Sequence, residues 1–205
     1  MGLIERYCWA PLLDRCMRNQ DTAAQREKVV PRAVGRVLEI GVGSGLNWPY
    51  YDAAHVEAVC GIEPSAVLLE KAKERARGLA VRVELQRGSA EALPFDASAF
   101  DTIVTTFVLC SIPNVTAALG EMRRVLRPGG RLLFAEHGLA SDPRIARWQK
   151  RLNPMWRRFS CGCNMDRPIS QLVQGAGFRL EKCETAYLPG PKLLTYNYWG
   201  AATPS

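Results

Sequence analysis

A run of alternating glycines is the first segment whose residue types and spacing could do chemistry. Gly41, Gly43 and Gly45 follow the short apolar run at residues 37–40. Glycine lets the backbone turn tightly and approach a ligand at positions where a Cβ atom would intrude. Because position 46 is leucine, the G-x-G-x-G spacing misses by one residue the G-x-G-x-x-G that admits a dinucleotide pyrophosphate.

A carboxylate, Glu63, follows directly after the next apolar run, residues 56–62. A carboxylate at the end of a parallel strand can accept hydrogen bonds from the ribose hydroxyls of an adenosine. Taken alone, the glycines also suit a plain tight turn between a strand and a helix. The loop, Glu63 and the order of the predicted strands together favour an adenosine-containing ligand.

These residues need a sheet to bring them together, and the sequence predicts one. Short apolar runs alternate with helical patterns, which is typical of βαβ units. Ser65 and Asn114 are placed to cap two helices, and Asp166 and Pro168 open another. Strands are predicted at residues 37–40, 56–62, 81–85, 101–107 and 131–136, followed by a C-terminal pair at 178–187 and 194–201. The link within that pair is too short for a helical crossover, so the two strands pair antiparallel in an otherwise parallel α/β sheet.

Four motifs in the chain resemble those of the class I S-adenosylmethionine-dependent methyltransferases. They are Glu39 with its three glycines, Glu63, the stretch GSAEALPF at 88–95 and the stretch LRPGG at 126–130. The resemblance runs from about residue 36 to 136 and extends more loosely to the C-terminus. It implies a three-layer Rossmann-like methyltransferase fold, with S-adenosyl-L-methionine as cofactor and S-adenosyl-L-homocysteine as product.

The resemblance also implies a set of cofactor-binding residues. In that family the turn at 88–90 contacts the adenine through a polar side chain and a backbone N–H, and Pro64 and Leu93 flank the ring. Family members often carry aspartate where this chain has Ser89, which makes that contact weaker or water-mediated here. The expected cofactor-binding residues are Glu39, Gly41, Gly43, Gly45, Asn47, Glu63, Pro64, Ser89, Ala90, Glu91, Thr106 and Cys110.

A second group of motifs resembles a narrower branch, the thiol S-methyltransferases and their small bacterial relatives. It comprises VLCS at 108–111, Glu136-His137-Gly138, FSCGCNMDR at 159–167 and LPGP at 188–191. The resemblance implies a small-molecule acceptor, with an alkyl thiol as one candidate. His137 is then a candidate general base, although a structural histidine at a strand end is an equal alternative. Cys163 is a candidate for the acceptor pocket.

Other functions remain open on the sequence. An O-, N- or C-methyltransferase of a lipid or quinone-like molecule would have the same cofactor motifs, as would a non-catalytic S-adenosylmethionine-binding module. The net charge of +7 permits anionic partners without requiring them. No nucleic acid partner is expected, because TTFVLCS at 105–111 replaces the motif that methyltransferases of base amino groups share.

The cysteines predict reduced thiols and no metal site. Seven cysteines are an odd number and are scattered over the chain. The C-x-C spacing of Cys161 and Cys163 is poor for zinc, and Cys60 and Cys183 suit small buried strand positions. Arsenic(III), which related enzymes bind through several cysteines, is a minor alternative that the spacing does not specify. His55, beyond the helix expected after the glycines, is interpreted as a surface residue.

The 205 residues suggest a single methyltransferase domain. We expect a helical cap at 1–33, a cofactor-binding core at 36–136 and acceptor-side helices and strands at 137–205. No signal-peptide pattern is present, so a cytoplasmic protein is expected, with a monomer slightly favoured. The segment 144–167 is basic and interspersed with apolar residues, and Pro154 is expected to break its helix. A packed helix with a solvated basic face is favoured over contact with a membrane surface.

Overall fold

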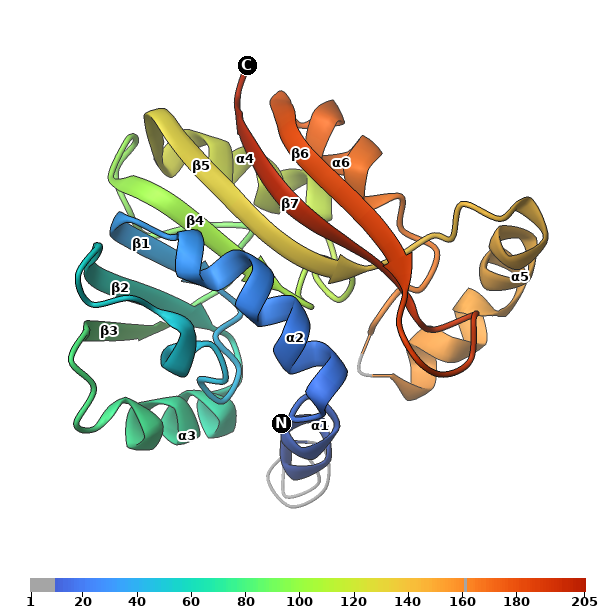
Figure 1. Cartoon of the computed structure of the whole chain (residues 1–205), viewed down its shortest axis with the longest axis horizontal. Helices are drawn as coiled ribbons and strands as arrows, with labels where there is room; N and C mark the ends of the chain where they lie inside the picture. Colours follow the sequence, from blue (N-terminus) through green and yellow to red (C-terminus); the bar gives the residue numbers. More distant parts are fainter. Residues whose placement is uncertain (1–9, 161) are drawn as a thin grey trace.

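A seven-stranded sheet forms the centre of the protein. The computed structural model describes residues 10–160 and 162–205 (Figure 1). The strands are β1 (Gly35–Ile40), β2 (Val56–Glu63), β3 (Arg82–Arg87), β4 (Phe100–Thr106), β5 (Leu126–His137), β6 (Phe178–Tyr187) and β7 (Tyr196–Pro204), in the order β3-β2-β1-β4-β5-β7-β6. Strands β1 to β5 pair in parallel, whereas β7 is antiparallel to both β5 and β6. The predicted α/β fold with an antiparallel C-terminal hairpin is confirmed.

Helices cover both faces of this sheet. They are α1 (Ala10–Cys16), α2 (Gln20–Val29), α3 (Ala66–Ala76), α4 (Val115–Val125), α5 (Pro143–Phe159) and α6 (Ile169–Gly175), with short 3₁₀ helices at Val30–Arg32 and Trp48–Tyr50. Figure 1 shows α2 crossing the near face, α4 and α6 behind the sheet, and α5 beyond the β6 side. The result is the three-layer arrangement typical of Rossmann-like methyltransferases.

Neighbouring residues of β1 belong to different cores. Val37 packs in a cluster with Val29 of α2 and Ala72 of α3. Leu38 packs in a second cluster with Leu119 of α4. Successive side chains of a strand point to opposite faces, so one short apolar strand supplies both layers of packing.

Two predicted helix caps are confirmed in the structure. Ser65 Oγ accepts a hydrogen bond from the backbone N–H of Leu68 at 3.4 Å, and Asn114 Oδ1 accepts one from Ala117 at 3.1 Å. Each bond satisfies a backbone donor that has no partner inside its helix. Helices α3 and α4 therefore begin where the cap residues predict.

Two local expectations were wrong. The segment after the glycines forms only the 3₁₀ helix at Trp48–Tyr50, because the Trp48 indole turns inward and donates to Ala72 O at 3.2 Å. Strand β5 begins at Leu126, five residues before the start of the strand predicted at 131–136. Its ladder with β4 shifts register between Phe100 and Thr102, which accommodates the Pro-Gly-Gly sequence as an irregularity. His55 is exposed, as expected, and its Nδ1 lies 2.8 Å from Asp52 Oδ2.

Helix α5 continues through Pro154, contrary to the predicted break. Proline in a helix interior costs about 3 kcal/mol or more, since it removes one hydrogen bond and crowds the preceding turn. Buried side chains on the same helix offset this cost. Gln149 donates to Gly138 O at 3.1 Å and accepts from Ala140 N at 2.8 Å, and Asn153 accepts from Met165 N at 3.0 Å.

Among the described helices, none combines the length and the apolar character that a membrane crossing requires.

Candidate cofactor and acceptor site

A cavity of about 260 Å³ lies at the carboxyl ends of β1, β2 and β4. The strand order reverses between β1 and β4, and open α/β sheets bind ligands at such a reversal. Eight of the twelve predicted cofactor-binding residues line the cavity: Gly41, Gly43, Asn47, Glu63, Pro64, Ser89, Ala90 and Thr106. Glu39, Gly45, Glu91 and Cys110 do not line it.

Gly43 and Gly45 serve different purposes in the glycine loop. Gly43 has φ +57°, and the nearest heavy atom to a Cβ placed there would be Gly41 O at 3.9 Å. The space beside Gly43 is therefore open for a ligand to approach its main chain. A Cβ on Gly45 would lie 2.0 Å from Trp48 Nε1, so this glycine makes room for a buried tryptophan.

Glu63 meets the glycine loop directly. Its Oε2 accepts a hydrogen bond from the backbone N–H of Gly43 at 2.9 Å, and its Oε1 accepts one from Ser65 at 2.9 Å. The carboxylate is buried, and these bonds hold it at the end of β2. The structure thus brings the glycine segment and Glu63 to one cavity.

Glu39 lies behind the cavity and positions two residues that line it. Asn47 Nδ2 donates to Glu39 Oε1 and to Thr106 Oγ1, each at 3.0 Å, and Tyr51 Oη donates to Glu39 Oε2 at 2.6 Å. Burial raises the pKa of Glu39 to about 7, although the bonds from Tyr51 and Asn47 act in the opposite direction. Glu39 therefore orients Asn47 and Thr106 from below the loop.

Glu91 has a comparable supporting position. Its Oε1 accepts from the backbone N–H of Asn114 at 2.5 Å, and its Oε2 accepts from Ser89 Oγ at 3.1 Å. The side chain thus connects the start of α4 to the turn at 88–90. Ser89 and Ala90 line the cavity, while Glu91 holds them there.

Asp14 of α1, which the sequence did not single out, ties the N-terminal helices to the glycine loop. Its carboxylate accepts two hydrogen bonds from Arg75 of α3, at 2.9 and 3.0 Å, and a third from Ser44 Oγ. Arg75 also donates to Ser44 O at 2.7 Å. Asp14 and Ser44 both line the cavity, so this group of three side chains closes α1 over it.

Arg26 of α2 is the cation among the residues that line the cavity. It is buried, Nη1 donates to Met17 O at 3.0 Å, and Nε has no hydrogen-bond partner within the described residues. Its guanidinium carbon lies 5.6 Å from the ring centroid of Phe107, whose φ of +59° is rare for a residue with a side chain. No local pattern marks Arg26, because its role depends on how α2 crosses the sheet.

The family follows from the part of the chain that builds this cavity. Residues 38–134 match the family model described as a methyltransferase domain, and they contain the glycine loop and Glu63. This part of the chain belongs to the class I methyltransferase domains. The resemblance noted in the sequence is thereby confirmed.

Relatives of this chain are named for different acceptors. It is 38% identical over 120 residues to a phosphatidylethanolamine N-methyltransferase of Cereibacter sphaeroides, covering 58% of each chain. It is 32% identical over 158 residues to the human thiol S-methyltransferase TMT1A, covering 75% of this chain and 64% of that one. The chain thus spans about three fifths of these relatives' lengths. A solved S-adenosylmethionine-dependent methyltransferase of Thermotoga maritima shares the fold, with a TM-score of 0.70, 21% identity and 98% coverage of both chains.

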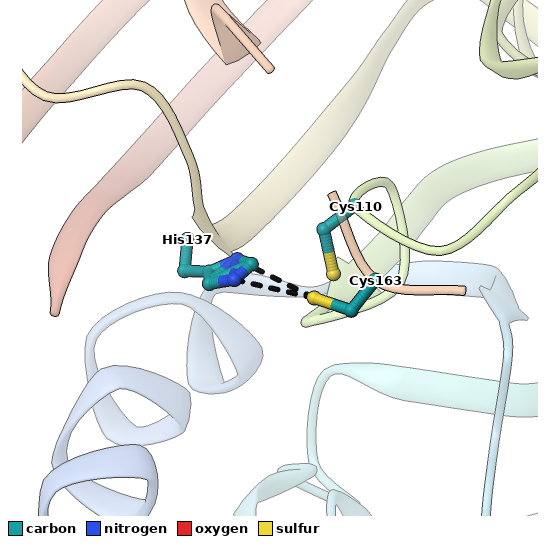
Figure 2. A group of neighbouring side chains, drawn as sticks. All are labelled: Cys110, His137 and Cys163. Atoms are coloured by element: carbon teal, nitrogen blue, oxygen red, sulfur yellow. Dashed lines mark hydrogen bonds between the residues drawn. The ribbon is translucent and has the colours of Figure 1, made fainter. Parts of the chain in front are cut away.

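His137 and Cys163 lie together, outside the residues that line the cavity. Cys163 Sγ is 3.2 Å from His137 Nε2, and Cys110 lies beside them (Figure 2). Contact with Cys110 and His137 lowers the pKa of the Cys163 thiol to about 5. Burial lowers the pKa of His137, yet the contact with Cys163 reverses this effect and leaves it raised. Cys161, also considered in the sequence, lies outside the described residues.

The segment after α5 brings Cys163 to this position. Asn164 donates two hydrogen bonds to Cys110 O, from its backbone N–H at 2.9 Å and from Nδ2 at 2.8 Å. Arg167 donates to Leu109 O and, at 2.7 Å, to Ile112 O. These bonds fasten residues 163–167 to the turn at 108–112. Val108, Ser111 and Ile112 in that turn line the cavity, so the cysteine–histidine group lies directly behind one of its walls.

Proposed function

We propose that this protein transfers a methyl group from S-adenosyl-L-methionine to the thiol of a small molecule. The observation that carries the proposal is the 2.9 Å contact between Gly43 N–H and Glu63 at the cavity. A carboxylate in this position can exchange its contact with the loop for the ribose hydroxyls, and the open space at Gly43 admits the adjoining part of the cofactor.

Other residues of the cavity fit the remaining parts of the cofactor. Ser89, Ala90 and Pro64 all line the cavity, which supports their assignment to the adenine. Arg26, the cation among the residues that line the cavity, suits the carboxylate of the methionine part. Charge-assisted hydrogen bonds of this kind are about twice as strong as those between neutral groups.

In this reaction the protein forms no covalent bond with either substrate. The acceptor thiolate attacks the methyl carbon, a new sulfur–carbon bond forms, and the bond from that carbon to the sulfonium breaks. The products are a methyl thioether and S-adenosyl-L-homocysteine, and the thiol proton has passed to water beforehand. Orientation of the two sulfur atoms can supply roughly 7–11 kcal/mol of the barrier.

A general base in the cavity is not required for this acceptor. A thiol with a pKa of about 8.5 is a few per cent thiolate near neutral pH, and the thiolate is the nucleophile. His137 faces Cys163 and is absent from the cavity lining. We therefore assign His137 and Cys163 no direct part in methyl transfer.

The extent of similarity favours the thiol. The match to the human thiol S-methyltransferase covers 158 residues, so it reaches beyond the domain core at 38–134 into acceptor-side segments. The match to the phosphatidylethanolamine N-methyltransferase covers 120 residues. The five cysteines that the structure describes are free thiols, which suits the cytoplasm as the working compartment.

Two measurements test this function. Isothermal titration with S-adenosyl-L-homocysteine should give one binding event per chain, and no heat at millimolar ligand would rule out a methyltransferase. Mass spectrometry with isotopically labelled S-adenosyl-L-methionine should then detect methylated alkyl thiols. Transfer of the labelled methyl group to phenols or amines, with none to thiols, would rule out a thiol as the acceptor. Binding without any product across the panel would favour a non-catalytic binding module.

A lipid acceptor is a second candidate, and the surface of α5 favours it. Trp148, Met155 and Phe159 recur at helical spacing and are 54%, 60% and 67% exposed. Arginines and lysines alternate with them along the helix. Exposed apolar side chains among cationic ones are typical of a helix that lies on an anionic membrane surface.

Vesicle sedimentation tests that surface. Wild-type protein should sediment with vesicles of phosphatidylethanolamine and phosphatidylglycerol, and a Trp148→Ala, Phe159→Ala variant should not. Val34→Ser changes an exposed apolar residue away from α5 and is the matched control. Equal sedimentation of the α5 variant and the control would remove the support for a lipid acceptor.

A further inference from the structure

Three metal-ligating side chains from distant parts of the chain meet behind the cavity. Cys110 lies in the turn after β4, His137 ends β5, and Cys163 follows α5 (Figure 2). One sulfur or nitrogen atom from each residue lies within 4.8 Å of the other two. The sequence shows no close pair of ligands of the kind that marks a zinc site, so this group arises only from the fold.

The spacing of these atoms is close to that of a metal site. Zinc bonds to sulfur at about 2.3 Å and to imidazole nitrogen at about 2.0–2.1 Å, so tetrahedral ligand atoms lie about 3.5–3.8 Å apart. Cys163 Sγ and His137 Nε2 are already 3.2 Å apart, and no pair in the group is more than 4.8 Å apart, which is at most about 1 Å beyond the tetrahedral spacing. Rotation of side chains is sufficient to close such a gap.

The ligand chemistry selects the ion. Two thiolates and one imidazole are preferred by Zn²⁺, whereas Mg²⁺ and Ca²⁺ prefer oxygen ligands. Two thiolates also neutralise a divalent cation, so the complex carries no net charge of its own. A complex without net charge avoids the cost of burying a charge. Cys110 is buried and the other two side chains are half-buried.

We propose that Cys110, His137 and Cys163 bind one Zn²⁺ ion and leave its fourth coordination position open. Three protein ligands with one open position are the pattern of zinc sites that take water or another small ligand. The ligands come from three separate segments, so the ion would connect residues 163–167, the end of β5 and the turn at 108–112. That turn borders the cavity, and the ion would stiffen its wall.

The proposal is tested on the untagged full-length chain, reduced and stripped with a chelator. After dialysis against Zn²⁺, elemental analysis should find about one equivalent per chain, and the melting temperature should rise. Titration with Co²⁺ should produce a thiolate-to-cobalt charge-transfer band together with the visible bands of a tetrahedral ion. Retention of less than about a tenth of an equivalent, or no charge-transfer band, would overturn the proposal.

Single substitutions locate the ion. Cys110→Ser, Cys163→Ser and His137→Ala should each weaken Zn²⁺ binding by more than about 100-fold, since loss of supporting residues alone costs 10–100-fold. Cys16→Ser, at an exposed cysteine of α1, and Cys161→Ser should both retain the wild-type affinity. Circular dichroism of the metal-free variants separates loss of the ion from loss of the fold.

Two results would show that the ion binds at other residues or does not bind. Undiminished binding by Cys163→Ser would contradict the assigned ligands, as would a loss in Cys161→Ser equal to that in Cys110→Ser. Neither result depends on methyl transfer, so the zinc site and the proposed function can fail separately.

Discussion

The backbone N–H of Gly43 lies 2.9 Å from Glu63 Oε2, across the carboxyl ends of two neighbouring strands. This contact joins the two features of the sequence on which an adenosine site depends. It also leads to the first prediction, because the carboxylate that receives the loop is the group we assign to the ribose.

Glu63→Ala should weaken binding of S-adenosyl-L-homocysteine. Loss of hydrogen bonds to a charged group costs roughly 1.5–3 kcal/mol, which is about a 10- to 150-fold loss of affinity. Isothermal titration measures it, and Glu57→Ala, at an exposed residue of the same strand, is the control. Unchanged affinity in Glu63→Ala would show that the ribose assignment is wrong.

Gly43→Val and Gly45→Val should fail in different ways. At Gly43 the nearest atom to a new Cβ is 3.9 Å away, so the side chain fits the protein but fills the cavity. We expect cofactor binding to fall by more than about 100-fold, with a loss of about 1–2 kcal/mol in stability from the positive φ. At Gly45 the 2.0 Å approach to Trp48 should destabilise the fold itself. Thermal unfolding and titration separate the two effects, and equal melting temperatures would contradict this distinction.

Arg75→Ala should destabilise the protein through Asp14. The variant leaves a buried carboxylate without two of its hydrogen bonds, which costs about 1–3 kcal/mol. Lys73→Ala removes an exposed ion pair with Glu70 on the same helix and should change stability by less than about 0.5 kcal/mol. Urea denaturation compares them, and similar losses in both variants would count against the role of Asp14 in holding α1.

Glu39→Gln should change the pH dependence of stability. The pKa of Glu39 is about 7 in the folded protein and near 4.5 in the unfolded chain. Between these two pH values Glu39 is therefore protonated in the folded protein and ionised in the unfolded chain. The contribution of Glu39 to stability therefore falls as the pH rises through this interval. Relative to wild type, the variant should gain up to about 3 kcal/mol between about pH 5 and pH 8. Urea denaturation at both pH values tests this, and a constant difference would contradict it.

Much of the fold could be predicted from the sequence, because its signals are local. The apolar runs at 56–62 and 101–107 correspond closely to β2 and β4, and Ser65 and Asn114 cap their helices through bonds to nearby backbone groups. Gly43 and Glu63 could be paired in advance because strands that run in parallel end at the same edge of a sheet.

Predictions from local sequence patterns were wrong where contacts between residues far apart in the sequence decide the conformation. Pro154 predicts a helix end, but Gln149 and Asn153 bond to other segments and hold α5 continuous. Likewise, Trp48 prefers a buried position under α3, and this shortens the expected helix to a single 3₁₀ turn.

The sequence by itself determined the family, the layered sheet and the glycine–carboxylate pair. Only the tertiary structure decided that Asp14 meets Arg75 and that Cys110, His137 and Cys163 form one group. The reason is physical, since periodicity and capping act over a few residues along the chain. Contacts between residues far apart in sequence depend on the path of every segment between them.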